Sequence, residues 1–167
     1  GIAGFSQDAV SLILLVFGVG MIIGNLLGGR LADRGLAPAL IITLAVLAAV
    51  LGLFPFALGY QWTTVVFVGL LGMAGFATVA PLQLWVLNRA EGAASLASSF
   101  NIGAFNLGNA IGAGLGGVVI ERSGSFTAVP GAAALVALTG LAVAVWAIKR
   151  EHGESLRPAP AIYCEQE

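Results

Sequence analysis

Five long runs of apolar residues dominate the sequence, and short polar or turn-forming segments separate them. The runs cover residues 9–29, 39–58, 63–87, 95–120 and 127–148. A helix needs about 20 mainly apolar residues to cross the hydrocarbon core of a bilayer, whereas barrel strands are about half as long and alternate in polarity. The pattern therefore predicts an all-α membrane protein with five transmembrane helices, in a domain over residues 1–148.

The C-terminal segment has a different character. From Lys149 onward the chain is polar and contains Pro158 and Pro160. A segment with so few apolar residues buries too little surface to offset the entropy lost on ordering. We therefore expect residues 149–167 to form a disordered tail.

Lysine and arginine residues are distributed unevenly between the two ends of the predicted helices. One side would carry Arg30, Arg34, Arg89, Lys149, Arg150 and Arg157, and the other side only Arg122. Short loops rich in Lys and Arg remain in the cytoplasm. We therefore expect a multi-pass protein of the cytoplasmic (inner) membrane, with the N-terminus outside and the C-terminus in the cytoplasm.

Composition narrows the possible classes of function. Only 9% of residues are charged and 59% are hydrophobic, whereas soluble domains carry about 25% charged residues. A net charge of −1 without a basic patch argues against nucleic acid as a partner. The single cysteine, Cys164, and the single histidine, His152, both lie in the polar tail. We therefore expect no metal site, no cofactor and no enzymatic activity.

Two segments of the chain repeat each other. Residues 20–34 and 108–122 are offset by 88 positions (108 − 20 = 88), and seven of the fifteen positions are identical. The identical pairs are Gly20/Gly108, Ile23/Ile111, Gly24/Gly112, Leu27/Leu115, Gly28/Gly116, Gly29/Gly117 and Arg34/Arg122. Glycine-rich membrane helices can match by chance, which is the alternative interpretation. An acidic residue followed by arginine at the same end of both segments favours a true repeat.

The two copies of the repeat have opposite orientations in the membrane. Its copies lie in the first and fourth spans, which cross the membrane in opposite directions, and inverted repeats of this kind are typical of secondary transporters. The third, fourth and fifth spans form one complete unit, whereas the other unit has only two spans. We therefore expect one further helix before Gly1, in a longer transporter of which this chain is a fragment.

The segment from Gly29 to Gly35 reads GRLADRG. It resembles the G-x-L-A-D-R signature of the major facilitator superfamily, found between the second and third helices of each six-helix half. The preceding residues 24–28 are similar to drug- and sugar-efflux members of the arabinose-efflux-permease type, and residues 101–112 resemble their eleventh helix. The signature often continues with basic residues, but here Leu36, Ala37 and Pro38 follow.

The resemblance implies that the chain covers helices eight to twelve of twelve, as a partial six-helix half. It also implies efflux of a small drug- or sugar-like molecule by alternating access, coupled to protons. The implied partners are that substrate, protons, the lipid bilayer and the missing N-terminal half. A membrane scaffold or subunit without transport activity is the alternative function.

Three groups of residues are candidates for function. The signature residues Gly29, Asp33 and Arg34 could form a gating loop, or the arginines could only set the topology. Two glycine stripes predict close helix packing; they are Gly20, Gly24, Gly28 and Gly108, Gly112, Gly116. Polar amides within spans usually face a cavity or another helix. The amides could therefore line the substrate pathway or form interhelical hydrogen bonds; they are Asn25, Gln83, Asn101, Asn106 and Asn109. Phe105 lies on the same helical face as Asn101 and Asn109 and is a further candidate for the pathway.

Overall fold

The computed structural model describes residues 7–90 and 92–155, and these residues contain helices and no strands. The elements are α1 (Gln7–Arg34), α2 (Leu36–Ala57), α3 (Gln61–Ala77), α4 (Val79–Leu87), α5 (Ala94–Ser123) and α6 (Ala128–Ser155). Helices α3 and α4 together form one span, so five helices are long and apolar enough to cross a membrane. The predicted fold class, an all-α membrane protein with five spans, is confirmed.

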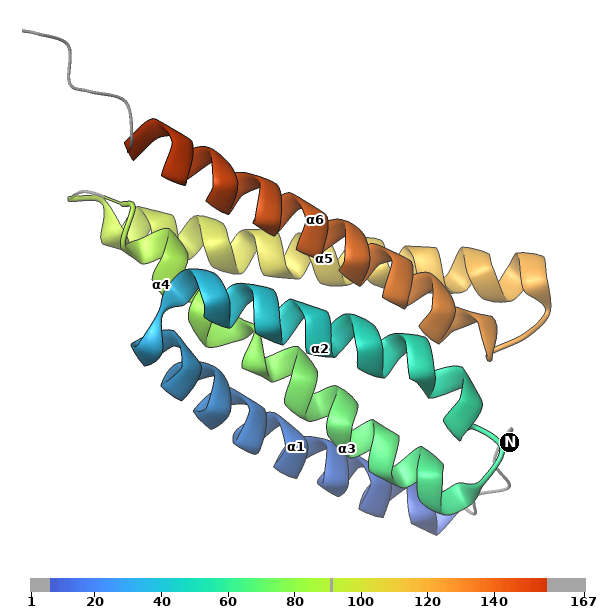
Figure 1. The fold of residues 1–167 in the computed structure, drawn as a ribbon. Coiled ribbons are helices and arrows are strands. Elements are labelled where there is room, and N and C mark those ends of the chain that lie inside the picture. Colours follow the sequence, from blue (N-terminus) through green and yellow to red (C-terminus); the bar gives the residue numbers. More distant parts are fainter. Residues whose placement is uncertain (1–6, 91, 156–167) are drawn as a thin grey trace, which may run out of the picture.

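The helices lie side by side along one common direction (Figure 1). Helix α3 packs against α1 and α2, and α2 also packs against α6. Helix α5 contacts only α4 and α6 among the described elements, and none of its residues is buried. One long apolar helix is therefore left almost uncovered.

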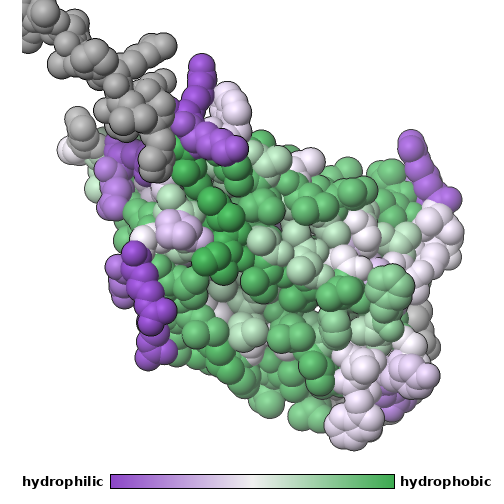
Figure 2. Space-filling model, in the orientation of Figure 1, coloured by the Kyte–Doolittle hydropathy of each residue, from purple (hydrophilic) through white to green (hydrophobic). Residues whose placement is uncertain are grey.

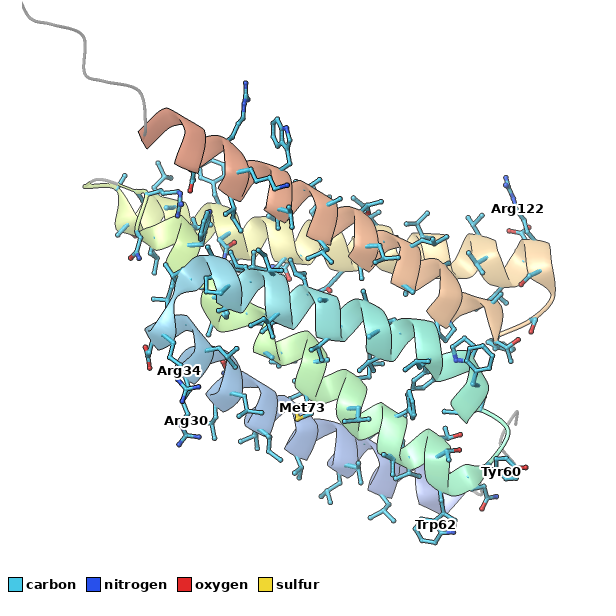
Figure 3. The ribbon with its side chains drawn as sticks, viewed as in Figure 1. Arg30, Arg34, Tyr60, Trp62, Met73 and Arg122 are labelled. Atoms are coloured by element: carbon cyan, nitrogen blue, oxygen red, sulfur yellow. The ribbon has the colours of Figure 1, made fainter. Side chains whose placement is uncertain are left out.

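The surface matches a membrane environment. Figure 2 shows hydrophobic residues over the middle of the bundle and hydrophilic residues gathered at its two ends. Tyr60 and Trp62 stand at one end, 76% and 84% exposed, where aromatic side chains commonly meet the lipid headgroups. Arg30 and Arg34 lie at the end opposite Arg122 (Figure 3).

The first polar segment is shorter than expected. Residues 30–38 were predicted to connect two spans, but α1 continues through Arg34 and α2 begins at Leu36. Arginine, leucine and alanine are good helix formers, so nothing in residues 30–34 interrupts the helix. Gly35 alone makes the turn, with its N–H 3.1 Å from the carbonyl oxygen of Ala32. The proposed gating loop is thus the last turn of α1 followed by one residue.

The boundary predicted at Lys149 is also wrong. Helix α6 continues to Ser155, because its last turns contain lysine, arginine and glutamate, which favour helix despite their polarity. The remaining part of the predicted tail, residues 156–167, lies outside the described residues.

The third span is kinked. Pro81 is fully buried and has no N–H, so it cannot bond to the carbonyl oxygen of Ala77, four residues earlier. The helix is interrupted at Thr78, whose hydroxyl donates to the carbonyl oxygen of Gly75 at 2.7 Å. The kink separates α3 from α4 and aims α4 toward α5.

Candidate substrate pathway and helix contacts

A cluster of polar side chains joins α4 to α5. The Nε2 atom of Gln83 donates a hydrogen bond to the Oγ atom of Ser98 at 2.8 Å, and the Nδ2 atom of Asn101 donates to the Oε1 atom of Gln83. Gln83, Ser98 and Asn101 are all half-buried. The structure therefore brings two of the predicted pathway residues together, in an interhelical hydrogen-bond network.

The remaining pathway residues on α5 are not part of this cluster. Asn106 and Asn109 are exposed, and no side-chain hydrogen bond is formed by either of them within the described residues. Phe105 lies at the same helical face as Asn101 and Asn109 by spacing, and it is exposed. These amides point away from the helices of this chain.

Asn25 belongs to a different surface. It lines an open groove of about 470 Å³ along α1, together with Ile22, Leu26, Gly29, Arg30 and Asp33. Asn25 and Asp33 are both exposed. Asp33 forms no ion pair with Arg30 or Arg34 in the part of the chain that the structure describes. Of the signature residues, Gly29 and Asp33 thus share one open groove on α1, and the described residues show no closed ionic latch.

The glycine stripe of α1 lies directly against the backbone of α3. A Cβ atom added to Gly24 would lie 2.8 Å from the Cα atom of Met73, and one added to Gly28 would lie 2.9 Å from the Cα atom of Ala77. A Cβ atom on Gly20 would lie 3.1 Å from the carbonyl carbon of Gly69. Met73 is labelled in Figure 3, where it lies between the two helices. Close backbone packing of α1 on α3 therefore requires glycine at these positions.

The glycine stripe of α5 has no such neighbour. A Cβ atom on Gly108 or Gly112 would meet nothing within 4 Å, and one on Gly116 would meet only the Cγ1 atom of Val129 at 3.9 Å. The stripe borders a groove of about 480 Å³ between α5 and α6. The structure does not pack this second stripe against a helix of the described chain.

An ionic contact that sequence reasoning missed joins the ends of α4 and α6. Arg89 donates from Nε to Oε1 of Glu151 at 2.5 Å and from Nη2 to Oε2. Its guanidinium carbon also lies 3.5 Å from the ring centroid of Trp85, one helical turn earlier. The spacing of Trp85 and Arg89 could have indicated the stacking, whereas the pairing with Glu151 requires the helix that replaced the predicted tail.

Comparison with known proteins identifies related sequences. The family model described as Major Facilitator Superfamily matches residues 2–163. The inner membrane transport protein YdhP of Escherichia coli (strain K12) is 43% identical over 134 residues, which cover 80% of this chain and 34% of YdhP. AraJ of Escherichia coli (strain K12) is 34% identical over 142 residues, covering 84% of this chain and 36% of AraJ.

More distant relatives extend the same group. A probable sugar efflux transporter of Helicobacter pylori (strain J99 / ATCC 700824) is 32% identical over 127 residues, covering 74% of this chain and 32% of that protein. No solved structure matches the chain. The chain spans about a third of the length of the curated relatives that it matches.

Proposed function

The chain belongs to the Major Facilitator Superfamily, and we propose that it forms most of the C-terminal half of a secondary active transporter. The transporter exports a small drug- or sugar-like molecule across the cytoplasmic membrane by alternating access. The names of YdhP, an inner membrane transport protein, and of the Helicobacter relative, a probable sugar efflux transporter, support this proposal. The proposal includes a further membrane helix before residue 1 and an N-terminal half of the transporter.

The observation that carries the proposal is the uncovered face of α5. This helix is apolar enough to span a membrane, yet none of its residues is buried by the described chain. Asn106 and Asn109 are exposed on it. Because polar amides are costly in lipid, this surface must face protein or a water-filled cavity. A central cavity between two halves of a transporter provides both.

The polar cluster distinguishes the first two turns of α5 from the middle of the helix. Gln83 on the kinked span bonds to both Ser98 and Asn101, and so holds the first part of α5 against that span. Asn109, two helical turns further on, is exposed and forms no side-chain hydrogen bond within residues 7–90 and 92–155. We therefore assign Asn109 to substrate contact and Asn101 to positioning of α5, with Phe105 and Asn106 lining the same cavity.

Replacement of each asparagine by alanine tests this assignment. Asn109→Ala should change the substrate profile of the full-length transporter and leave its melting temperature unchanged, because Asn109 is exposed and forms no side-chain hydrogen bond within the described residues. Asn101→Ala should lower the unfolding free energy by about 1 kcal/mol, the usual size of an interhelical hydrogen bond in membranes. Thermal unfolding and transport kinetics on both variants provide the measurements. An Asn109→Ala variant with lowered stability and an unchanged substrate profile would reject the pathway role.

We also propose that the groove along α1 contributes to gating. Gly29, Asp33 and Arg34 lie on the last turns of α1. Gly29 and Asp33 line the groove, together with Asn25 and Arg30. A charged and partly apolar surface of this kind suits a contact with the other half that forms in one conformation and separates in another.

Proton coupling belongs to the same proposal and rests on the resemblance to efflux transporters. The described carboxylates Asp33, Glu121 and Glu151 lie in the last turns of α1, α5 and α6. None of these three described carboxylates lies deep in a span, so none of them is placed to bind the coupled proton within the membrane. Flux measured with and without a pH gradient tests it: a rate that does not respond to the gradient contradicts proton coupling.

A further inference from the structure

One face of α6 carries a stripe of exposed residues that ends in a positive charge. Helix α6 lies at the edge of the bundle (Figure 1) and packs against α2 and α5 alone among the described helices. Four exposed residues of α6 follow one another at intervals of four and so share one helical face; they are Leu138, Ala142, Trp146 and Arg150. The stripe is therefore apolar along the span and ends in an aromatic ring followed by a guanidinium group.

This stripe has the character of a surface that meets lipid. Ile148, on the opposite face of α6, is only 8% exposed and lines a groove shared with α2 and α4. Thr139 lies beside the stripe, and its hydroxyl donates to the carbonyl oxygen of Val136 at 2.7 Å, so it needs no partner from another helix. Trp146 is 59% exposed. Because tryptophan is enriched where hydrocarbon gives way to headgroups, Trp146 marks that level on α6.

Two positive charges stand just beyond the tryptophan ring. Lys149 and Arg150 follow Trp146 by three and four residues, so both are its neighbours on the helix surface. The guanidinium carbon of Arg150 lies 5.0 Å from the ring centroid of Trp146, a cation–π contact that orients the guanidinium group and leaves its N–H donors available. Neither cation forms an ion pair with a side chain that the structure describes, whereas the adjacent Glu151 pairs with Arg89.

We propose that Trp146, Lys149 and Arg150 bind the headgroup of an anionic phospholipid, whose acyl chains lie along Leu138 and Ala142. Charge complementarity identifies this occupant, because leaflets that contain anionic lipids attract lysine and arginine at their surface. The guanidinium group donates two parallel N–H bonds to the phosphodiester oxygens, and Trp146 is the positioning residue that holds it at headgroup depth. The inference requires only that the chain spans a membrane and does not depend on the proposed transport.

Arg89 adjusts the charge of this site from another helix. Its bond to Glu151 balances a carboxylate that is adjacent in sequence to Arg150. Arg89→Gln removes the balancing charge, so the Glu151 carboxylate should then repel the lipid phosphate. Glu151→Gln in the same variant removes the repulsion and should restore lipid binding.

Native mass spectrometry of the full-length protein in detergent tests the site. The probes are dioleoyl phosphatidylglycerol and dioleoyl phosphatidylcholine, which share their acyl chains and phosphate and differ in net charge. The wild-type protein should prefer phosphatidylglycerol, and Arg150→Gln should weaken its binding about fivefold, the usual effect of one cation at an anionic surface. Trp146→Leu should weaken it about threefold and cause no further loss in the Arg150→Gln background.

Arg30→Gln is the matched control, because Arg30 is exposed at the end of α1 and α1 does not contact α6. It should leave the affinity for phosphatidylglycerol unchanged, and melting temperatures without lipid should confirm that every variant is folded.

Several results would overturn the site. They are equal binding of the two lipids by the wild-type protein, equal losses in Arg30→Gln and Arg150→Gln, and independent, additive losses from Trp146→Leu and Arg150→Gln. Failure of Glu151→Gln to restore binding in Arg89→Gln would reject the control by α4. A lipid-free dimer that dissociates on Trp146→Leu would assign the stripe to a second copy of the protein instead.

Discussion

At the scale of single residues, the contact between α1 and α3 depends on three missing side chains. The carbonyl groups of Gly69, Met73 and Ala77 occupy the space that a Cβ atom on Gly20, Gly24 or Gly28 would need. Backbone atoms cannot move aside as the end of a flexible side chain can. The interface should therefore be unusually sensitive to the addition of even a few carbon atoms.

Gly24→Leu tests this sensitivity, with Gly18→Leu as the matched control on the same helix. Gly18 has nothing within 4 Å of an added Cβ atom, so both variants gain the same helix propensity and only one meets the backbone of Met73. We expect Gly24→Leu to lower the unfolding free energy by about 3 kcal/mol, at the upper end of overpacking costs. Thermal unfolding in detergent measures the difference, and equal melting temperatures would refute the interface.

The residue patterns predicted some contacts and could not predict others. The four-residue spacing of Gly20, Gly24 and Gly28 indicates a smooth helix face, but spacing alone does not identify α3 as the partner. Nor does it distinguish a filled stripe from an open one, as Gly112 illustrates. Ser98 escaped notice because a serine in a membrane helix usually bonds to its own backbone, whereas here it accepts a bond from Gln83.

At the scale of elements, the third span connects several parts of the bundle because it is kinked. Its α3 portion packs against α1, its α4 portion reaches α5 through Gln83, and Arg89 in the turn after α4 bonds to Glu151 of α6. The missing N–H of Pro81 follows from the sequence alone, and an interrupted helix is its usual consequence. The partners of α4 depend on the path of the chain after the kink, which local sequence does not determine.

The ion pair between Arg89 and Glu151 leads to a prediction about stability. Both side chains are 41% exposed, so we expect a coupling free energy of at most about 1 kcal/mol in a double-mutant cycle. The cycle uses Arg89→Gln, Glu151→Gln and the double variant, measured by thermal unfolding. The coupling should fall as salt is raised, because exposed ion pairs are screened. A coupling energy of zero at low salt, where screening is weakest, would show that the pair does not stabilise the bundle.

Helix boundaries were the least predictable feature of the elements. A membrane span was expected to end where its charges begin, at Arg30 and at Lys149. Helices α1 and α6 instead continue through these charges to Arg34 and Ser155, because charged residues can remain helical beyond the hydrocarbon core. Hydropathy measures where lipid ends, and backbone hydrogen bonding determines where the helix ends.

At the scale of the whole molecule, the bundle has two unlike ends. Arg30 and Arg34 lie at one end and Arg122 at the other (Figure 3). Arg89 is placed at the C-terminal end of α6 by its bond to Glu151. The unequal number of positive charges predicts which end faces the cytoplasm, because loops rich in Lys and Arg remain there.

Cysteine labelling determines this orientation. In a Cys164→Ser background, Gln61→Cys should react with a membrane-impermeant thiol reagent added outside intact cells, and Ala93→Cys should react only after the cells are opened. Both positions are exposed and lie at consecutive turns between spans. The reverse labelling pattern would invert the proposed topology.

The number and type of spans could be predicted from the sequence, since five apolar runs of membrane length admit few other folds. The repeat of residues 20–34 in residues 108–122 further indicated that two units of the chain have inverted topology in the membrane. The sequence could not show that Asn101 is held by Gln83 while Asn109 is free of such a bond, because this depends on how α4 and α5 meet.

Substrate counterflow in proteoliposomes tests the central claim, that the chain is part of a secondary transporter, most directly. Purified full-length protein is reconstituted, liposomes are loaded with an unlabelled sugar or drug, and entry of the labelled compound is followed without any ion gradient. We predict transient accumulation above equilibrium for at least one compound of a panel of sugars and lipophilic drugs, and a changed preference in Asn109→Ala. Folded, correctly inserted protein that shows no counterflow for any compound would contradict the account and favour a membrane scaffold.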